Sequence, residues 1–136
     1  MKMSKILSEQ DQERVSRKFE SFKKSDYTDK DFNDVFGKEK QIKSKSSKGA
    51  LAEHAEDVHL FFSMLHDYFA GKYARMPRGT ISATIFTLIY VFAPVDLIPD
   101  FLPIIGLTDD AAMLALCTKF ISSDLKKYKT WKSKLS

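Results

Sequence analysis

The sequence predicts an all-α fold: a small helical bundle around a central apolar antiparallel helical hairpin. Glycine and proline are scarce, at five and four among 136 residues, which favours helices over a turn-rich β fold. Apolar residues recur at three- and four-residue steps along several segments, as in amphipathic helices. Two strongly apolar segments also flank a stretch rich in proline and aspartate, which would turn the chain back on itself. The length fits one domain with one core.

Two mostly polar helices are predicted within residues 1–49, and we expect both to lie at the periphery of the bundle. The first should begin with Ser8 as its N-cap and Asp11 as the capping-box partner. Its apolar stripe is sparse and comprises Val15, Phe19 and Phe22. A helix with so few apolar residues offers only a narrow face for packing.

The second of these helices repeats the capping signal with Thr28 and Asp31, and it should end between Gly37 and Lys43. The run KSKSSKG that follows is basic, rich in serine and free of apolar residues, a composition typical of a linker. We therefore expect a boundary there, with the peripheral helices and a basic linker before it and a helical domain at 50–136 after it.

A sharply periodic segment at 50–71 predicts one amphipathic helix that Gly71 terminates. Its apolar face is formed by Leu51, Ala55, Val58, Phe62, Leu65 and Phe69. The polar residues of the segment are assigned to the solvent side: Glu53, Glu56, His59, Ser63, His66 and Asp67.

Residues 80–93 and 109–127 are predicted to form the two helices of the central hairpin. The first would be roughly 21 Å long, short of the roughly 30 Å hydrocarbon core of a bilayer. In the second, Thr108 is the expected N-cap and would place Asp109 and Asp110 at the first two helical positions, where the helix dipole favours carboxylates. Two destinations are open for this hairpin, the core of a bundle or a shallow position in a membrane.

The connection between these helices, PVDLIPDFLPIIGLTDD, is the most informative motif of the chain. Its prolines disfavour a continuous helix and indicate a rigid, irregular turn. The residues that define this turn are Pro94, Asp96, Pro99, Asp100, Pro103, Gly106, Thr108, Asp109 and Asp110. Apart from Thr108, and together with Tyr90, Leu97, Ile98, Phe101 and Ala111, they resemble the pattern of the YkvA-like family, a bacterial domain of unassigned function. The resemblance covers roughly residues 61–131, and it implies a membrane-associated protein, since members of the family often have that character.

The four aspartates of the turn are the first candidate site. An antiparallel hairpin would gather Asp96, Asp100, Asp109 and Asp110 at one end, where clustered carboxylates suit Ca²⁺ or Mg²⁺. The alternative is structural, with Asp109 and Asp110 serving the helix start and the other two accepting backbone N–H groups freed by the prolines. The structural reading has more weight. Under the metal reading, a divalent cation is the possible cofactor, and metal-dependent activity is the alternative function of the protein.

A basic and aromatic edge is the second candidate site. Arg75 and Arg78 precede the first hairpin helix and should lie opposite the turn, near Lys126, Lys127 and Trp131 at the other end of the chain. Basic and aromatic residues together suit an anionic membrane surface. An ordinary solvated charged rim is the equally weighted alternative.

The remaining candidates carry less weight. His59, Ser63 and His66 share a helical face with Glu56 one turn earlier, so zinc is geometrically conceivable, but no HExxH motif is present. Cys117 lies in an apolar helix and is expected to be buried and inert. The sequence has no phosphate-binding glycine loop and no nucleophile elbow. It also has no nucleic-acid recognition motif, which argues against a nucleic-acid partner.

These observations favour a non-catalytic helical binding or scaffolding module over an enzyme. Its expected partner is an anionic membrane surface or another protein. The absence of an apolar signal segment in residues 1–13 and the single cysteine predict a cytoplasmic protein that is not secreted. The apolar hairpin and its basic flanks add association with the cytoplasmic face of the membrane as an expectation.

Overall fold

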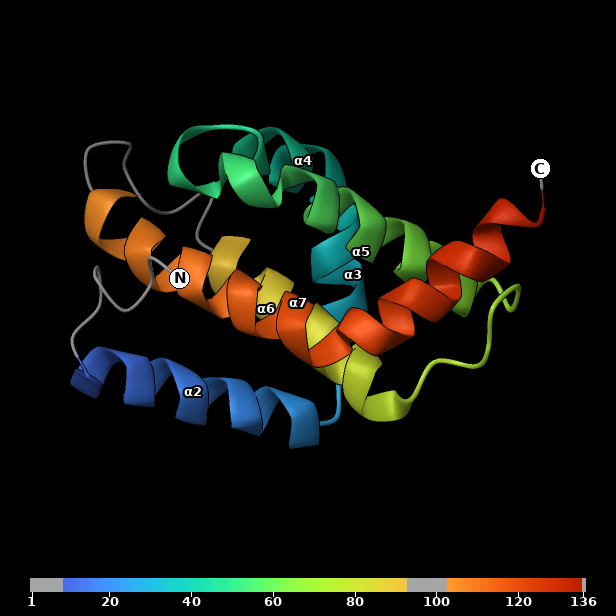
Figure 1. Ribbon diagram of the computed structural model, residues 1–136, viewed down its shortest axis with the longest axis horizontal. Coiled ribbons are helices and arrows are strands. Elements are labelled where there is room, and N and C mark those ends of the chain that lie inside the picture. Colours follow the sequence, from blue (N-terminus) through green and yellow to red (C-terminus); the bar gives the residue numbers. More distant parts are fainter. Residues whose placement is uncertain (1–8, 93–102, 136) are drawn as a thin grey trace.

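The computed structural model describes residues 9–92 and 103–135, and within these ranges the chain is all-α (Figure 1). The α-helices are α2 (Glu9–Lys24), α3 (Asp29–Gly37), α4 (Glu39–Ser46), α5 (Ala55–Phe69), α6 (Arg78–Phe92) and α7 (Pro103–Ser133), and a 3₁₀ helix, η1 (Gly49–His54), precedes α5. They pack as a small bundle, which confirms the predicted fold class.

The apolar helix α6 forms the centre of this bundle. It packs against α2, α3 and α7, and ten of its fifteen residues are buried. Near its start, Thr80 bonds Asp124 late in α7, whereas Ala83 contacts the earlier Cys117. The two helices therefore run antiparallel and in contact, as predicted for the hairpin, and in the view of Figure 1 α7 passes in front of α6. Residues 93–102 of the connection, which include Pro94 and Pro99, lie outside the described residues.

The start of α7 differs from the prediction. The helix begins at Pro103, so Gly106 and Thr108 lie inside it and Thr108 is not its N-cap. Proline is well tolerated in the first helical turn, because the N–H groups there have no partner within the helix in any case. Asp109 and Asp110 are consequently the seventh and eighth residues of α7 rather than its first two.

The N-terminal helices contribute to the same core as the hairpin. Val15 and Phe19 of α2 are buried, and Phe22 stacks on Phe86 of α6 with ring centroids 6.0 Å apart. The expected capping box of the second helix is present: the Thr28 hydroxyl accepts from the Asp31 N–H, and the Asp31 carboxylate accepts from the Thr28 N–H. The Ser8 cap lies outside the described residues.

The predicted linker is wrong, because Lys43 to Ser46 are helical and form the second half of α4. Ile42 is 3% exposed and Ser46 is fully buried, so this segment is anchored in the core. An ion pair of 2.7 Å between Glu39 and Lys43, one turn apart, adds local support. Charged residues with long side chains are good helix formers. The composition of the run gave no sign that Ile42, immediately before it, anchors the helix in the core.

The predicted helix at 50–71 is divided between η1 and α5. Val58, Phe62 and Leu65 are buried as the periodicity requires. Gly71, with φ +78°, ends the helix as predicted, because few other residues adopt this left-handed conformation without strain.

Candidate functional site

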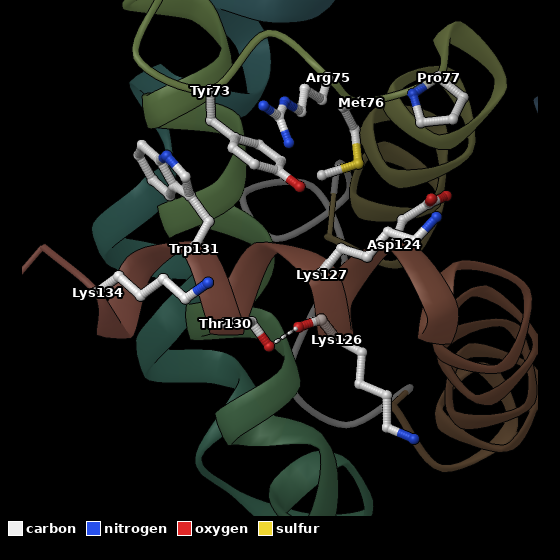
Figure 2. Close-up of a pocket in the computed structure, with 10 residues that line it drawn as sticks. All are labelled: Tyr73, Arg75, Met76, Pro77, Asp124, Lys126, Lys127, Thr130, Trp131 and Lys134. Carbon is white, nitrogen blue, oxygen red and sulfur yellow. Dashed lines mark hydrogen bonds between the residues drawn. The ribbon is translucent and has the colours of Figure 1, made fainter.

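A hollow lies at the end of the bundle where α6 begins and α7 ends. It has a volume of about 930 Å³ and is bordered by residues 70–77, which join α5 to α6, and by the last turns of α7. Tyr73, Arg75 and Met76 enter it from the joining segment (Figure 2). From α7 come Lys127 and Trp131, with further wall residues Pro77, Asp124, Lys126, Thr130 and Lys134. We call this hollow the terminal pocket.

Two aromatic side chains form one wall of the terminal pocket. The rings of Tyr73 and Trp131 lie with centroids 4.8 Å apart, and Tyr73 also meets Tyr128 edge-on at 5.3 Å. Tyr73 and Tyr128 are buried, whereas Trp131 is half-buried and borders the open space. The wall is therefore rigid, because three rings from two segments hold one another in place.

A buried polar network, which we call the Asp67 clamp, joins α5 to α7 behind this wall. The Tyr128 hydroxyl donates to Asp67 at 2.5 Å, and the Lys132 ammonium donates to the same oxygen at 2.7 Å. The Ser63 and Tyr128 hydroxyl oxygens are 2.5 Å apart. Because the Tyr128 proton is committed to Asp67, Ser63 is the donor in that bond.

The clamp changes the acid–base properties of its members. Burial raises the pKa of Asp67, but hydrogen bonds from Lys132 and Tyr128 outweigh burial, so the pKa lies below its ordinary value. Burial, together with the bond to Asp67, raises the pKa of Tyr128. The bond to Asp67 also raises the pKa of Lys132. The clamp is therefore held as carboxylate, neutral phenol and ammonium. The assignment of Asp67 to the solvent side was wrong, since its side chain is buried.

Four cations of the terminal pocket have no carboxylate partner among the residues that the structure describes. Within residues 9–92 and 103–135, Arg75, Lys126, Lys127 and Lys134 form no ion pair with another described residue. Six cations in other places do have carboxylate partners: Arg17 with Glu13, Lys23 with Glu20, Lys30 with Asp34, Lys43 with Glu39, Arg78 with Asp26, and Lys132 with Asp67. Exposed lysines such as Lys40, Lys48 and Lys129 form no ion pair with a described residue either, so the pocket is distinguished by the gathering of its cations around one hollow.

The predicted basic edge is thus brought together in large part. Arg75, Lys126, Lys127 and Trp131 all border the terminal pocket, although Figure 2 shows the Lys126 side chain pointing away from Arg75. Arg78 is separate, because its guanidinium pairs with Asp26 at 2.7 Å and lies over the Tyr27 ring.

The predicted aspartate site is not tested by the structure. Asp96 and Asp100 lie outside the described residues, and the side chains of Asp109 and Asp110 are likewise not described. Divalent cation binding there stays a prediction, which calorimetric titration with Ca²⁺, Mg²⁺ and Mn²⁺ would test. Among the side chains that are described, no group of three His, Cys, Asp or Glu residues is placed to hold a metal.

The histidine and cysteine candidates lie beside acidic residues, at the surface or in the core. His66 bonds Glu39 at 2.6 Å across two helices, His54 lies beside Glu53 and Asp57, and His59 is exposed. Cys117 is fully buried, as expected, and burial raises the pKa of its thiol to about 12.

Sequence reasoning missed the contacts that join Asp67, Tyr128 and Lys132 into the Asp67 clamp. Asp67 and Tyr128 are 61 positions apart, so no local spacing signals their contact. One signal was available, since Tyr128 and Lys132 are one helical turn apart and share a face of α7.

The described helices and the comparisons with known proteins both provide information on membrane association. Across residues 9–92 and 103–135, none of the helices combines the length and apolar character that a membrane crossing requires. The chain is 32% identical over 91 residues to the "Uncharacterized membrane protein YkvA" of Bacillus subtilis (strain 168). The aligned residues make up 67% of this chain and 82% of that protein. No solved structure matches the chain.

A family model also matches, and it falls on the hairpin. Residues 80–116, from α6 through the connection into α7, match the model described as "Protein of unknown function (DUF1232)". All the residues that line the terminal pocket lie outside that match, because they precede residue 80 or follow residue 116. By the hairpin match and the extent of similarity to YkvA, this chain is a member of the DUF1232 family.

Proposed function

We propose that this protein is a non-catalytic helical module that binds the anionic cytoplasmic face of the membrane through the end of the bundle that carries the terminal pocket. The observation that carries the proposal is the convergence of four cations, without ion pairs to described residues, on a wall of tyrosine and tryptophan. The Bacillus subtilis relative is named a membrane protein, which supports the proposal.

The chemistry of this surface suits a lipid headgroup region. A basic side chain near an anionic leaflet contributes about 1 kcal/mol, so the four cations together contribute up to roughly 4 kcal/mol at moderate salt. Tryptophan and tyrosine favour the membrane interface, where the ring contacts apolar groups and the polar atom stays hydrated. Half-buried Trp131 is placed for that role beside Lys127 and Lys134.

Sedimentation with vesicles tests the proposal. The full chain is mixed with vesicles of phosphatidylcholine alone or of phosphatidylcholine with 30 mol% phosphatidylglycerol. We expect binding to the anionic vesicles only, with loss of binding as added salt screens the charges. Recovery of all protein in the supernatant with both vesicle types at low salt would refute the membrane role.

A matched pair of variants locates the binding surface. Lys126→Gln with Lys127→Gln removes two positive charges from the terminal pocket, whereas Lys40→Gln with Lys48→Gln removes two exposed ones on or just after α4. The first pair should weaken vesicle binding by about tenfold or more, because about 1 kcal/mol is lost per charge. The second pair should have a much smaller effect.

A further inference from the structure

We propose that the terminal pocket is a headgroup site that takes the phosphate of one anionic phospholipid. This inference rests on the proposed membrane function and deepens it. A diffuse attraction between a basic patch and a membrane needs only a flat charged surface. Here the cations surround a hollow of about 930 Å³, which falls in the size range of small-molecule sites.

The cations reach the hollow from two different segments. Arg75 enters from residues 70–77, and Lys127 enters from α7, so that a ligand between them would bridge the two (Figure 2). A guanidinium binds phosphate with two parallel hydrogen bonds, and an ammonium adds a point charge. Neither group has an ion-pair partner among the described residues, so a phosphate would not have to displace a carboxylate from them.

The acidic residue on the wall does not cancel this charge. Asp124 accepts a hydrogen bond of 2.6 Å from the Thr80 hydroxyl, which occupies one of its carboxylate oxygens. Arg75, Lys126, Lys127 and Lys134 outnumber it four to one among the residues that line the hollow. The pocket therefore keeps a net positive charge and selects an anion.

The apolar part of the wall indicates a lipid rather than free phosphate. Trp131, Met76 and Pro77 border the same space as the cations. A free phosphate ion would gain nothing from these surfaces, whereas the glycerol backbone and first methylene groups of a lipid would bury apolar area against them. The site thus combines charge for the headgroup with apolar contact for the part of the lipid next to it.

Trp131 provides a direct test, because it is the single tryptophan of the chain. Its fluorescence is followed while the full chain is titrated with dihexanoyl phosphatidylglycerol below its micellar concentration, and in parallel with inorganic phosphate. We expect a saturable change with the short-chain lipid and a much weaker response to inorganic phosphate. Equal affinity for the two would mean that the site takes free phosphate, and the lipid assignment would fail.

Charge-matched variants separate a site from diffuse attraction. Arg75→Gln and Lys127→Gln should each weaken the titration by about tenfold, the loss typical of one hydrogen bond to a charged group. Lys129→Gln makes the same charge change on an exposed residue that does not line the pocket, and it should change affinity by less than about twofold. Arg75 and Lys127 are exposed, so their variants should keep the wild-type melting curve, which circular dichroism checks.

The outcomes distinguish the two proposals. Equal weakening by Lys129→Gln and Lys127→Gln, or vesicle binding without any saturable response of Trp131, would overturn the headgroup site and leave the membrane role standing. Failure of the wild-type chain to bind anionic vesicles would overturn the membrane role, and the headgroup site with it.

Discussion

Replacing Tyr128 by phenylalanine should destabilise the protein through one buried hydroxyl. The ring keeps its contacts with Tyr73 and Trp131, so the change removes the bond of 2.5 Å to Asp67 and the contact of 2.5 Å with Ser63. A hydrogen bond to a buried charged group contributes about 1.5–3 kcal/mol. Ser63 is half-buried and can turn to solvent, so its loss adds little. We expect the free energy of unfolding to fall by about 2 kcal/mol.

Urea unfolding followed by circular dichroism measures this loss as a lower midpoint, by about 1 M for a typical slope. Tyr73→Phe is the matched control, because Tyr73 is also buried and packs against Tyr128, yet its hydroxyl has no bonded partner among the described residues. The control should cost less than about 0.5 kcal/mol. Equal losses in the two variants would show that the Asp67 clamp contributes no specific stability.

Four further predictions follow from local features of the described structure. Because folding lowers the pKa of Asp67, the stability that this carboxylate contributes is complete above its ordinary pKa of 3.8 and is lost as the pH falls through its pKa in the folded protein. The urea midpoints of wild type and Asp67→Asn should therefore converge in acid. Cys117, with a pKa of about 12, should resist a disulfide-exchange reagent in the native protein and react once urea unfolds it, as absorbance of the released thiolate records. Thr28→Ala removes the capping box and should cost about 1 kcal/mol in the same unfolding assay, whereas Thr130→Ala, on an exposed face of α7, should not. Gly71→Ala should destabilise by about 1 kcal/mol although no atom lies within 4 Å of the added methyl, because the cost is conformational; Gly37→Ala is the control without a positive φ.

The features predicted correctly from the sequence are those that local chemistry decides. The capping box of Thr28 and Asp31 needs only residues three apart, and Gly71 ends its helix through its own backbone freedom. The antiparallel hairpin followed from two apolar segments around a run of prolines, which requires no knowledge of the rest of the chain. Local signals of this kind remain valid whatever the distant parts of the molecule do.

The errors arose where distant contacts or a single anchor decide the structure. Asp67 is polar on an amphipathic helix, and only Tyr128 and Lys132, more than sixty positions later, make its burial favourable. The linker prediction rested on composition, whereas the buried side chain of Ile42 fixes α4 to the core. Pro103 was taken as part of the turn, although proline is equally suited to the first turn of a helix.

The two sides of the end of α7 differ in a way that solubility alone does not explain. On the inner side, Tyr128 and Lys132 are fixed by the Asp67 clamp, which sets the rotation of the helix about its axis. The outer side therefore presents Lys127, Trp131 and Lys134, spaced by four and three residues, in a defined direction. A surface selected only for solubility mixes charges of both signs, as α2 and α3 do with their ion pairs one turn apart. Cations gathered on one face without such partners repel one another and destabilise the isolated protein, and the anionic headgroup that we propose would offset this repulsion by lying between them.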